Sequence, residues 1–142
     1  MTTSTAQPRS GAADTTPAAL LPFVRQKTVL LTTYRQDGTP VGTPVHLVVV
    51  GDRAFFRTWD QAWKFKRLRN NPEVTIAPST ARGKPTGPAI GARAKLLGAE
   101  EEALAARALA GKYPVVHGVL VPLYHRLNRL NTVYFEVRPS EA

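Results

Sequence analysis

The sequence Lys27-Thr-Val-Leu-Leu-Thr-Thr-Tyr34 is dense in β-branched and aromatic residues, which favour β-strands. It is followed by Arg35-Gln-Asp-Gly38, whose Asp-Gly pair supplies the positive φ angles of a tight hairpin turn. A second strand should therefore run back along the first, over residues 39–50. Because Pro40 and Pro44 cannot donate ladder hydrogen bonds, we expect the first half of that strand at a sheet edge or a bulge.

Short strands continue along the rest of the chain. Gly51-Asp52 predicts another turn, into a strand over 53–59, and further strands are expected at 73–77, 90–97 and 131–137. Helices are expected at 60–71 with Asp60 as N-cap, at 99–111 with Gly111 as its stop, and at 119–130. Six mostly antiparallel strands with helices between them predict an α+β fold, mainly β, built on a small closed or partly closed six-stranded β-barrel.

The length and composition favour one intracellular domain. A chain of 142 residues can bury a core of its own. Residues 1–18 lack the basic start and apolar run of a signal peptide, so we expect a disordered leader there, a domain over 19–142 and a cytoplasmic location. No apolar stretch approaches the length of a membrane span, which excludes a membrane protein with helical spans. With no Cys and three scattered His, no metal site is predicted.

The charge is concentrated in one part of the chain. Ten basic and two acidic residues lie between Arg53 and Lys95, so this segment carries +8 of the net charge of +9. Such a balance implies an anionic partner: a nucleic acid, a membrane surface or a small phosphorylated cofactor. Here a strand ending in Arg57 and Thr58 runs into a helix whose first turns carry Lys64, Lys66 and Arg67. Helix N-terminal amides and side-chain cations together suit a phosphate.

Several short motifs follow one another along the chain. They are Thr28-Val-Leu-Leu-Thr-Thr-Tyr34 with Asp37-Gly-Thr-Pro40, Thr43-Pro-Val45, Phe56-Arg-Thr58, Lys64-Phe-Lys-Arg-Leu68, Asn71-Pro72, Ala77-Pro78, Arg82-Gly83 and Gly87-Pro88. In this order and spacing the sequence resembles the pyridoxamine 5'-phosphate oxidase-like proteins, which have the FMN-binding type of split barrel. The resemblance runs from about residue 22 to residue 138. It points in particular to the small actinobacterial branch that uses the deazaflavin coenzyme F420.

The resemblance implies a homodimer with two cofactor sites at the subunit interface. It also implies an F420-dependent oxidoreductase that transfers a hydride from the reduced deazaflavin to a small unsaturated organic acceptor, with FMN as the alternative cofactor. The residues that match the family's cofactor site are Thr43, Pro44 and Val45 along the ring, Lys64 on the phosphate with Thr58 beside it, Arg57, Lys66 and Arg67 as added positive charge, and Arg82 as a contact from the partner subunit.

Two positions depart from the family pattern. Trp63 stands where relatives usually have Gly or Ser, and His46 stands where an aromatic residue is common. His46 follows Thr43-Pro-Val45 and is the one candidate proton donor. Trp63 could stack on the cofactor or fill the subunit interface. The hydride chemistry itself belongs to the cofactor, so no other catalytic residue is predicted.

Two further functions are compatible with the sequence. One is a basic small-barrel module for nucleic acid, with Phe55, Phe56, Trp59 and Trp63 as stacking platforms. The other is a protein that carries or sequesters the cofactor without turnover. Because the basic residues converge on one strand–helix junction, a small anionic ligand is favoured over nucleic acid.

Overall fold

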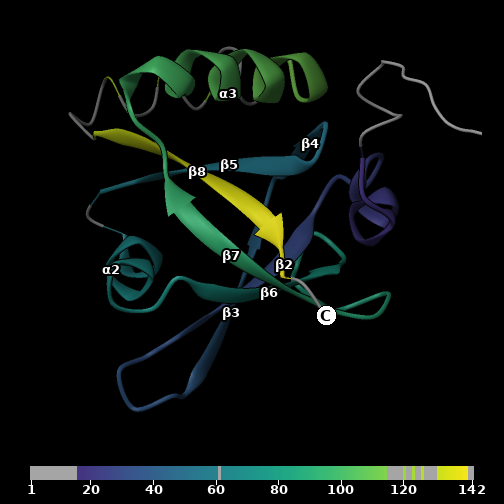
Figure 1. Cartoon of the computed structure of the whole chain (residues 1–142), viewed down its shortest axis with the longest axis vertical. Coiled ribbons are helices and arrows are strands. Elements are labelled where there is room, and N and C mark those ends of the chain that lie inside the picture. The colour runs from purple at the N-terminus through teal and green to yellow at the C-terminus, as the bar shows by residue number, and fades with distance from the viewer. Residues whose placement is uncertain are drawn as a thin grey trace, which may run out of the picture.

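The computed structural model describes residues 16–60, 62–114, 120, 123, 126 and 131–140. Short strands and three helical segments alternate along this part of the chain (Figure 1). In order they are the 3₁₀ helix η1 (Ala18–Phe23), β2 (Val29–Tyr34), β3 (Pro40–Val45), β4 (Val48–Val50), β5 (Arg53–Trp59), α2 (Trp63–Asn70), β6 (Glu73–Pro78), β7 (Ile90–Leu96), α3 (Ala99–Lys112) and β8 (Thr132–Pro139).

The strands form one antiparallel sheet in the order β3-β2-β6-β7-β8-β5-β4. Its two edges, β3 and β4, are separated in sequence by only His46 and Leu47. Because one continuous segment borders both edges, the sheet must curl back on itself, which gives the predicted split barrel. The strand predicted over 39–50 is therefore two strands, and the count of six becomes seven in this part of the chain. The edge position expected for its proline-containing half is confirmed.

The hairpin between β2 and β3 has the turn that the Asp-Gly pair predicts. Gly38 has a φ of 90°, and its amide donates to the carbonyl of Arg35 at 2.9 Å. The Thr39 amide donates to the Asp37 carboxylate, also at 2.9 Å. This turn fixes the register in which Leu31 lies opposite Thr43.

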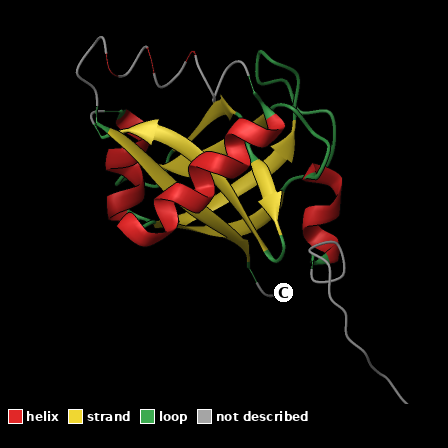
Figure 2. Ribbon diagram, turned by 90° about the horizontal axis from the view of Figure 1, so that it is seen from above, coloured by secondary structure: helices red, strands yellow, loops and turns green. Residues whose placement is uncertain are grey.

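The two faces of the sheet bury two separate cores. Phe56 points into the barrel with the residues of β2, β6 and β7, whereas its neighbour Phe55 points outward. Successive strand residues alternate in this way, so one strand serves both cores. On the outside, α3 packs Ala105 and Leu109 against Phe55 and Tyr134, and Figure 2 shows α3 lying across the outer face of the strands. Both Phe55 and Phe56 are fully buried, and each contributes roughly 2–3 kcal/mol of transfer free energy.

The bounds of the two described α-helices differ from the prediction, at the end of α3 and at both ends of α2. Helix α3 matches the expected element but continues through Gly111 to Lys112. Helix α2 begins at Trp63 with Ala62 as N-cap, so the prediction of Asp60 as N-cap was wrong. The reason is that Asp60 is tied to the start of β8: its amide donates to the Asn131 carbonyl, and its carboxylate accepts from the Asn131 side chain, both at 3.1 Å.

Two expected elements lie largely outside the described residues. Of the helix expected at 119–130, only residues 120, 123 and 126 are described, and of the expected leader only residues 16–18. Among the described helices, none is long and apolar enough to cross a membrane.

The C-terminal end of α3 binds the segment that joins the two sheet edges. The Lys112 ammonium donates to the backbone carbonyls of Leu47 at 2.8 Å, Gln26 at 2.7 Å and Phe23 at 3.3 Å. The Tyr113 hydroxyl lies 2.9 Å from the Leu47 carbonyl and 2.7 Å from that of Lys27. Burial lowers the pKa of Lys112 to about 8, so the ammonium form still predominates at neutral pH. One cation thus connects η1, the β3–β4 link and α3.

We expect Lys112→Met to destabilise the fold by about 2 kcal/mol, because it removes a charged donor from three backbone carbonyls while keeping the length of the side chain. Chemical denaturation at neutral pH measures this. Lys84→Met, the same change at an exposed position of the 79–89 loop, serves as the control and should leave the free energy of unfolding unchanged. Equal unfolding midpoints for Lys112→Met and the wild type would contradict the account.

Candidate functional site

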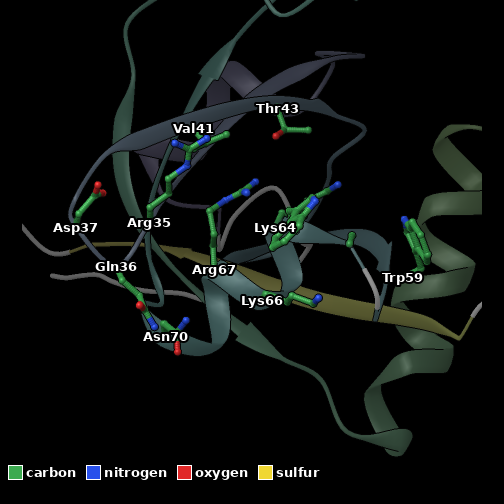
Figure 3. Close-up of a pocket in the computed structure, with 12 residues that line it drawn as sticks. Arg35, Gln36, Asp37, Val41, Thr43, Trp59, Lys64, Lys66, Arg67 and Asn70 are labelled. Atoms are coloured by element: carbon green, nitrogen blue, oxygen red, sulfur yellow. The ribbon is translucent and has the colours of Figure 1, made fainter.

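A cavity of about 1190 Å³ lies between the β2–β3 hairpin and α2 (Figure 3). Its walls come from two parts of the chain that meet only in the folded barrel. The hairpin contributes Arg35, Gln36, Asp37, Val41 and Thr43, and the end of β5 with α2 contributes Trp59, Ala62, Trp63, Lys64, Lys66, Arg67 and Asn70.

The alternation along β3 decides which of its side chains reach the cavity. Val41, Thr43 and Val45 share one face of the strand, and Val45 belongs to the inner core. Val41 and Thr43 lie nearer to the hairpin turn, where the core ends, so they line the cavity instead.

The packing of α2 turns two cations toward the same space. Phe65 and Leu68 pack against the inner core, and the ring of Phe65 meets Phe135 edge-on at 6.0 Å. Lys64 and Arg67 are three residues apart and share another side of the helix, which lines the cavity. In Figure 3 both side chains reach into the space below Thr43.

The cations of the cavity repel one another. Burial lowers the pKa of the half-buried Lys64, and the charge of Arg67 lowers it further. The pKa of Arg67 is lowered by burial and then by the charge of Arg35. Within the described part of the chain, no carboxylate forms a salt bridge to these three side chains. The Asp37 carboxylate lines the same cavity near Arg35, but one negative charge does not balance the cations there, so the cavity favours an anionic ligand.

Arg67 is held in place by the barrel. Its Nε donates to the Thr33 hydroxyl at 2.6 Å, and Thr33 is almost fully buried at the end of β2. This hydrogen bond leaves the terminal nitrogens of the guanidinium available for other acceptors.

Hydrogen-bond donors of two kinds lie where β5 meets α2: the first backbone amides of the helix and the hydroxyl of Thr58. The N-cap residue of α2, Ala62, makes no side-chain cap, so the first amides of the helix have no partner of that kind. The Thr58 hydroxyl is buried, and among the residues that the structure describes it has no hydrogen-bond partner. The turn between the two elements is short, with the Ala62 amide bonded to the Trp59 carbonyl at 3.0 Å. Amides, a hydroxyl and cations together form a set of donors that suits a phosphate.

The structure brings four of the residues predicted for the cofactor site together around the cavity: Thr43, Lys64, Lys66 and Arg67. Thr58 and Val45 do not line the cavity; both are buried, on the inner faces of β5 and β3. Arg57 does not line the cavity. It lies on the outer face of β5, where its guanidinium donates to the Tyr134 hydroxyl at 2.5 Å and stacks over the Tyr134 ring.

Three other predicted residues lie away from the cavity. Pro44 and Arg82 are exposed on the outer side of the barrel, where the 79–89 loop folds over β2 and β3. His46 stacks on Tyr113 with ring centroids 4.5 Å apart, at the contact with α3. Burial and the nearby Lys112 charge lower the pKa of His46, which favours its neutral form.

Sequence reasoning assigned Thr43 to the site but missed the rest of the hairpin side of the cavity. Arg35, Gln36 and Asp37 sit in the predicted turn, but nothing local indicates that the turn faces a helix about thirty residues later in the chain. The sequence signal that could have identified them was the predicted antiparallel pairing of β2 with β3, which puts the turn residues on the same hairpin as Thr43. Trp59, at the end of β5, and Asn70, at the end of α2, were likewise not assigned to the site.

The nucleic-acid alternative loses half of its stacking platforms. Phe55 and Phe56 are both fully buried, one in each core, so neither can stack on a base. Their burial follows from the alternation of a strand that has a core on both faces. Only Trp59 and Trp63 remain at a surface, and both line the cavity.

Solved structures with the same fold are many and distant in sequence. The heme storage protein HutZ from Vibrio cholerae is 16% identical, with a TM-score of 0.66 over 89% of this chain and 92% of that one. A structure described as an F420 reductase is 18% identical, with a TM-score of 0.56 over 88% and 96%. A FAD-binding protein from Mesorhizobium loti is 12% identical, with a TM-score of 0.57 over 84% and 83%. At these identities the likeness establishes the fold alone.

Among curated proteins no sequence is similar enough to count as a match. A family model does match, and it spans nearly the whole described barrel: the model of pyridoxamine 5'-phosphate oxidase aligns with residues 15–140. The matched range includes every strand and helix of the antiparallel barrel that the structure describes. The chain therefore belongs to the pyridoxamine 5'-phosphate oxidase family of split-barrel proteins.

Proposed function

We propose that this protein is an oxidoreductase that binds coenzyme F420 in the cavity between the β2–β3 hairpin and α2. The observation that carries the proposal is the cluster of Arg35, Lys64 and Arg67, three cations that share one cavity with a single carboxylate, that of Asp37, and that form no salt bridge among the described residues. Membership of the family supports a phosphorylated redox cofactor as the anion.

The residues present fit a phosphate. The Thr58 hydroxyl is buried without a described partner, and the first turn of α2 has no side-chain cap. A phosphate between them would accept hydrogen bonds from both and would neutralise Lys64 and Arg67. A neutral ligand would leave the repulsion among the cations in place.

When bound, the cofactor would supply the redox chemistry, the transfer of a hydride to an electron-poor carbon of the acceptor, with solvent as the source of the proton. The protein's own residues bind and orient. Lys64 and Arg67 hold the anionic end, Val41 and Thr43 form the opposite wall, and the barrel excludes water from one side. His46 lies outside the cavity wall, so we do not assign it the proton transfer.

The distribution of charge favours F420 over FMN. Beyond its phosphate, F420 carries a lactyl-oligoglutamate tail with several carboxylates. Arg35, on the hairpin, and Lys66, on the exposed side of α2, extend the positive wall of the cavity past the two cations that would hold the phosphate. FMN, with one phosphate, would leave this outer charge unmatched.

We also propose that the protein is a homodimer in which the outer face bearing Pro44 and Arg82 meets the partner. Both residues are exposed, and the adjoining loop packs against this face, with Gly83 beside Leu30 and Pro44. Light scattering during size-exclusion chromatography should give twice the chain mass for the wild type, and Arg82→Glu should reduce it. A wild-type mass equal to one chain would contradict the proposal.

Fluorescence titration of the purified protein with F420 and with FMN tests the cofactor. We expect micromolar or tighter binding, with F420 preferred. Lys64→Ala should weaken binding by about 1.5–3 kcal/mol, or roughly ten- to hundredfold in Kd, because it removes a charged donor from the phosphate.

Arg69→Ala is the matched control for this titration. Arg69 belongs to the same helix but is exposed and does not line the cavity, so its loss should leave the cofactor Kd within about twofold. Binding of neither cofactor would refute the proposed function. An equal effect of the two substitutions would show that net charge, and not a phosphate at Lys64, determines the affinity.

A further inference from the structure

A polar side chain interrupts the inner face of β2. Val29, Leu31 and Thr33 alternate along this face, and the first two belong to the inner core. Thr33 is as deeply buried, with 1% of its surface exposed, and it lies opposite Val41, which lines the cavity. A buried hydroxyl costs free energy unless it is hydrogen-bonded. The sequence thus places a hydroxyl where an apolar side chain of the same shape would pack without that cost.

The hydrogen bond of this hydroxyl crosses to α2. The Nε of Arg67 donates to the Thr33 oxygen at 2.6 Å, across 34 residues of sequence. A guanidinium is planar, so a bond that fixes the direction of Nε also fixes the plane in which the two terminal nitrogens lie. The edge that remains available is the one formed by those terminal nitrogens. This edge can donate two parallel hydrogen bonds to two oxygens of one phosphate.

The acceptor that orients Arg67 carries no charge. On the outer face of the barrel, by contrast, Arg53 forms salt bridges with both Glu101 and Glu136, so its charge is balanced within the protein. A hydroxyl orients a guanidinium without neutralising it. Thr33 therefore restrains the direction of the Arg67 side chain and leaves its full positive charge to a ligand.

The restraint matters because the neighbouring cations repel Arg67. Burial and nearby positive charge lower the pKa of both Lys64 and Arg67. A long, flexible side chain under such repulsion would turn toward solvent when no ligand is bound. Binding would then have to order it again, at a cost in affinity. The bond to Thr33 orders the guanidinium during folding instead, before a ligand arrives.

We infer that Thr33 is a positioning residue of the anion site, whose hydroxyl sets the Arg67 guanidinium so that its two terminal nitrogens meet two oxygens of the ligand's phosphate. The inference rests on the proposed function for the ligand, F420. It states that the site recognises its anion by direction as well as by charge. Removing the Thr33 hydroxyl leaves every charge in place and should nevertheless weaken binding.

Three substitutions in β2 test this by fluorescence titration with F420. Thr33→Val keeps the shape of the side chain but removes the hydroxyl, and it should raise the Kd about three- to tenfold, the range of one hydrogen bond. Thr33→Ser retains the hydroxyl and should recover most of the affinity. Thr32→Val is the matched control: this residue lies on the opposite face of the strand and does not line the cavity, so its Kd should stay within about twofold of the wild type.

The same change in the absence of the guanidinium shows whether Thr33 acts through Arg67. In an Arg67→Met background, Thr33→Val should raise the Kd by less than about twofold, because no guanidinium remains to be oriented. A role of Thr33 in packing alone would weaken binding equally in both backgrounds. Thermal unfolding verifies that each variant is folded.

Nuclear magnetic resonance provides a readout that needs no cofactor. In ¹⁵N-labelled protein the Nε–H signal of Arg67 is assigned by its loss in Arg67→Met. Its exchange with water should be about tenfold faster in Thr33→Val than in the wild type, and unchanged in Thr32→Val. Inorganic phosphate is the second probe of this cofactor-free protein, and Thr33→Val should raise its Kd by the same factor as that of F420.

The outcomes separate the two proposals. If neither F420 nor FMN binds, but phosphate binds and depends on the Thr33 hydroxyl, the proposed function fails and the role of Thr33 stands. Unchanged Kd values for F420 and phosphate in Thr33→Val would overturn the inference. Equal losses of affinity in the wild-type and Arg67→Met backgrounds would also overturn it, because Thr33 would then act independently of the guanidinium. Failure of F420, FMN and phosphate alike to bind would overturn both proposals.

Discussion

The closure of the barrel depends on a single segment that runs from one sheet edge to the other. β3 pairs only with β2 and β4 only with β5, yet His46 and Leu47 are the only residues between them. The Leu47 carbonyl at this crossing accepts hydrogen bonds from Lys112 and Tyr113, so α3 fixes the point where the edges meet. With that point fixed, the proline-containing half of the segment has to pass the mouth of the barrel. There it carries Val41 and Thr43 to the side of the cavity opposite α2.

The same geometry determines where the basic side chains of the chain lie. From the sequence alone their charge is compatible with any polyanion, but the fold places them in different surroundings. Arg53 forms salt bridges with Glu101 and Glu136, and Arg93 with Glu73, while Arg57 is engaged with Tyr134. Arg35, Lys64 and Arg67 face the cavity and form no salt bridge among the described residues, so part of the net positive charge lies at one small anion site that two tryptophans also line.

The sequence predicts most of the elements of this fold but only about a third of the residues that line the cavity. The Asp37-Gly38 turn and the strand alternation are local, so the hairpin and the antiparallel order could be predicted. Whether Phe55 and Arg57 or Phe56 and Thr58 face into the barrel could not be predicted, because α3 buries the outer face of β5 as well and no local pattern specifies that. Lys64 and Arg67 could be assigned because they share one side of one helix. Arg35 could not, because it joins them only through the closure of the barrel.

The most direct measurement of the central claim is a map of amide chemical shifts in uniformly ¹⁵N-labelled protein as F420 is added. The account predicts that the largest changes occur at the uncapped first turn of α2, at Trp63, Lys64 and Phe65, with a second group at Thr43 across the cavity. Inorganic phosphate at high concentration should reproduce the first group and not the second. Shifts concentrated at the outer face of β5 around Arg57, or at the α3 contact around His46, would contradict it.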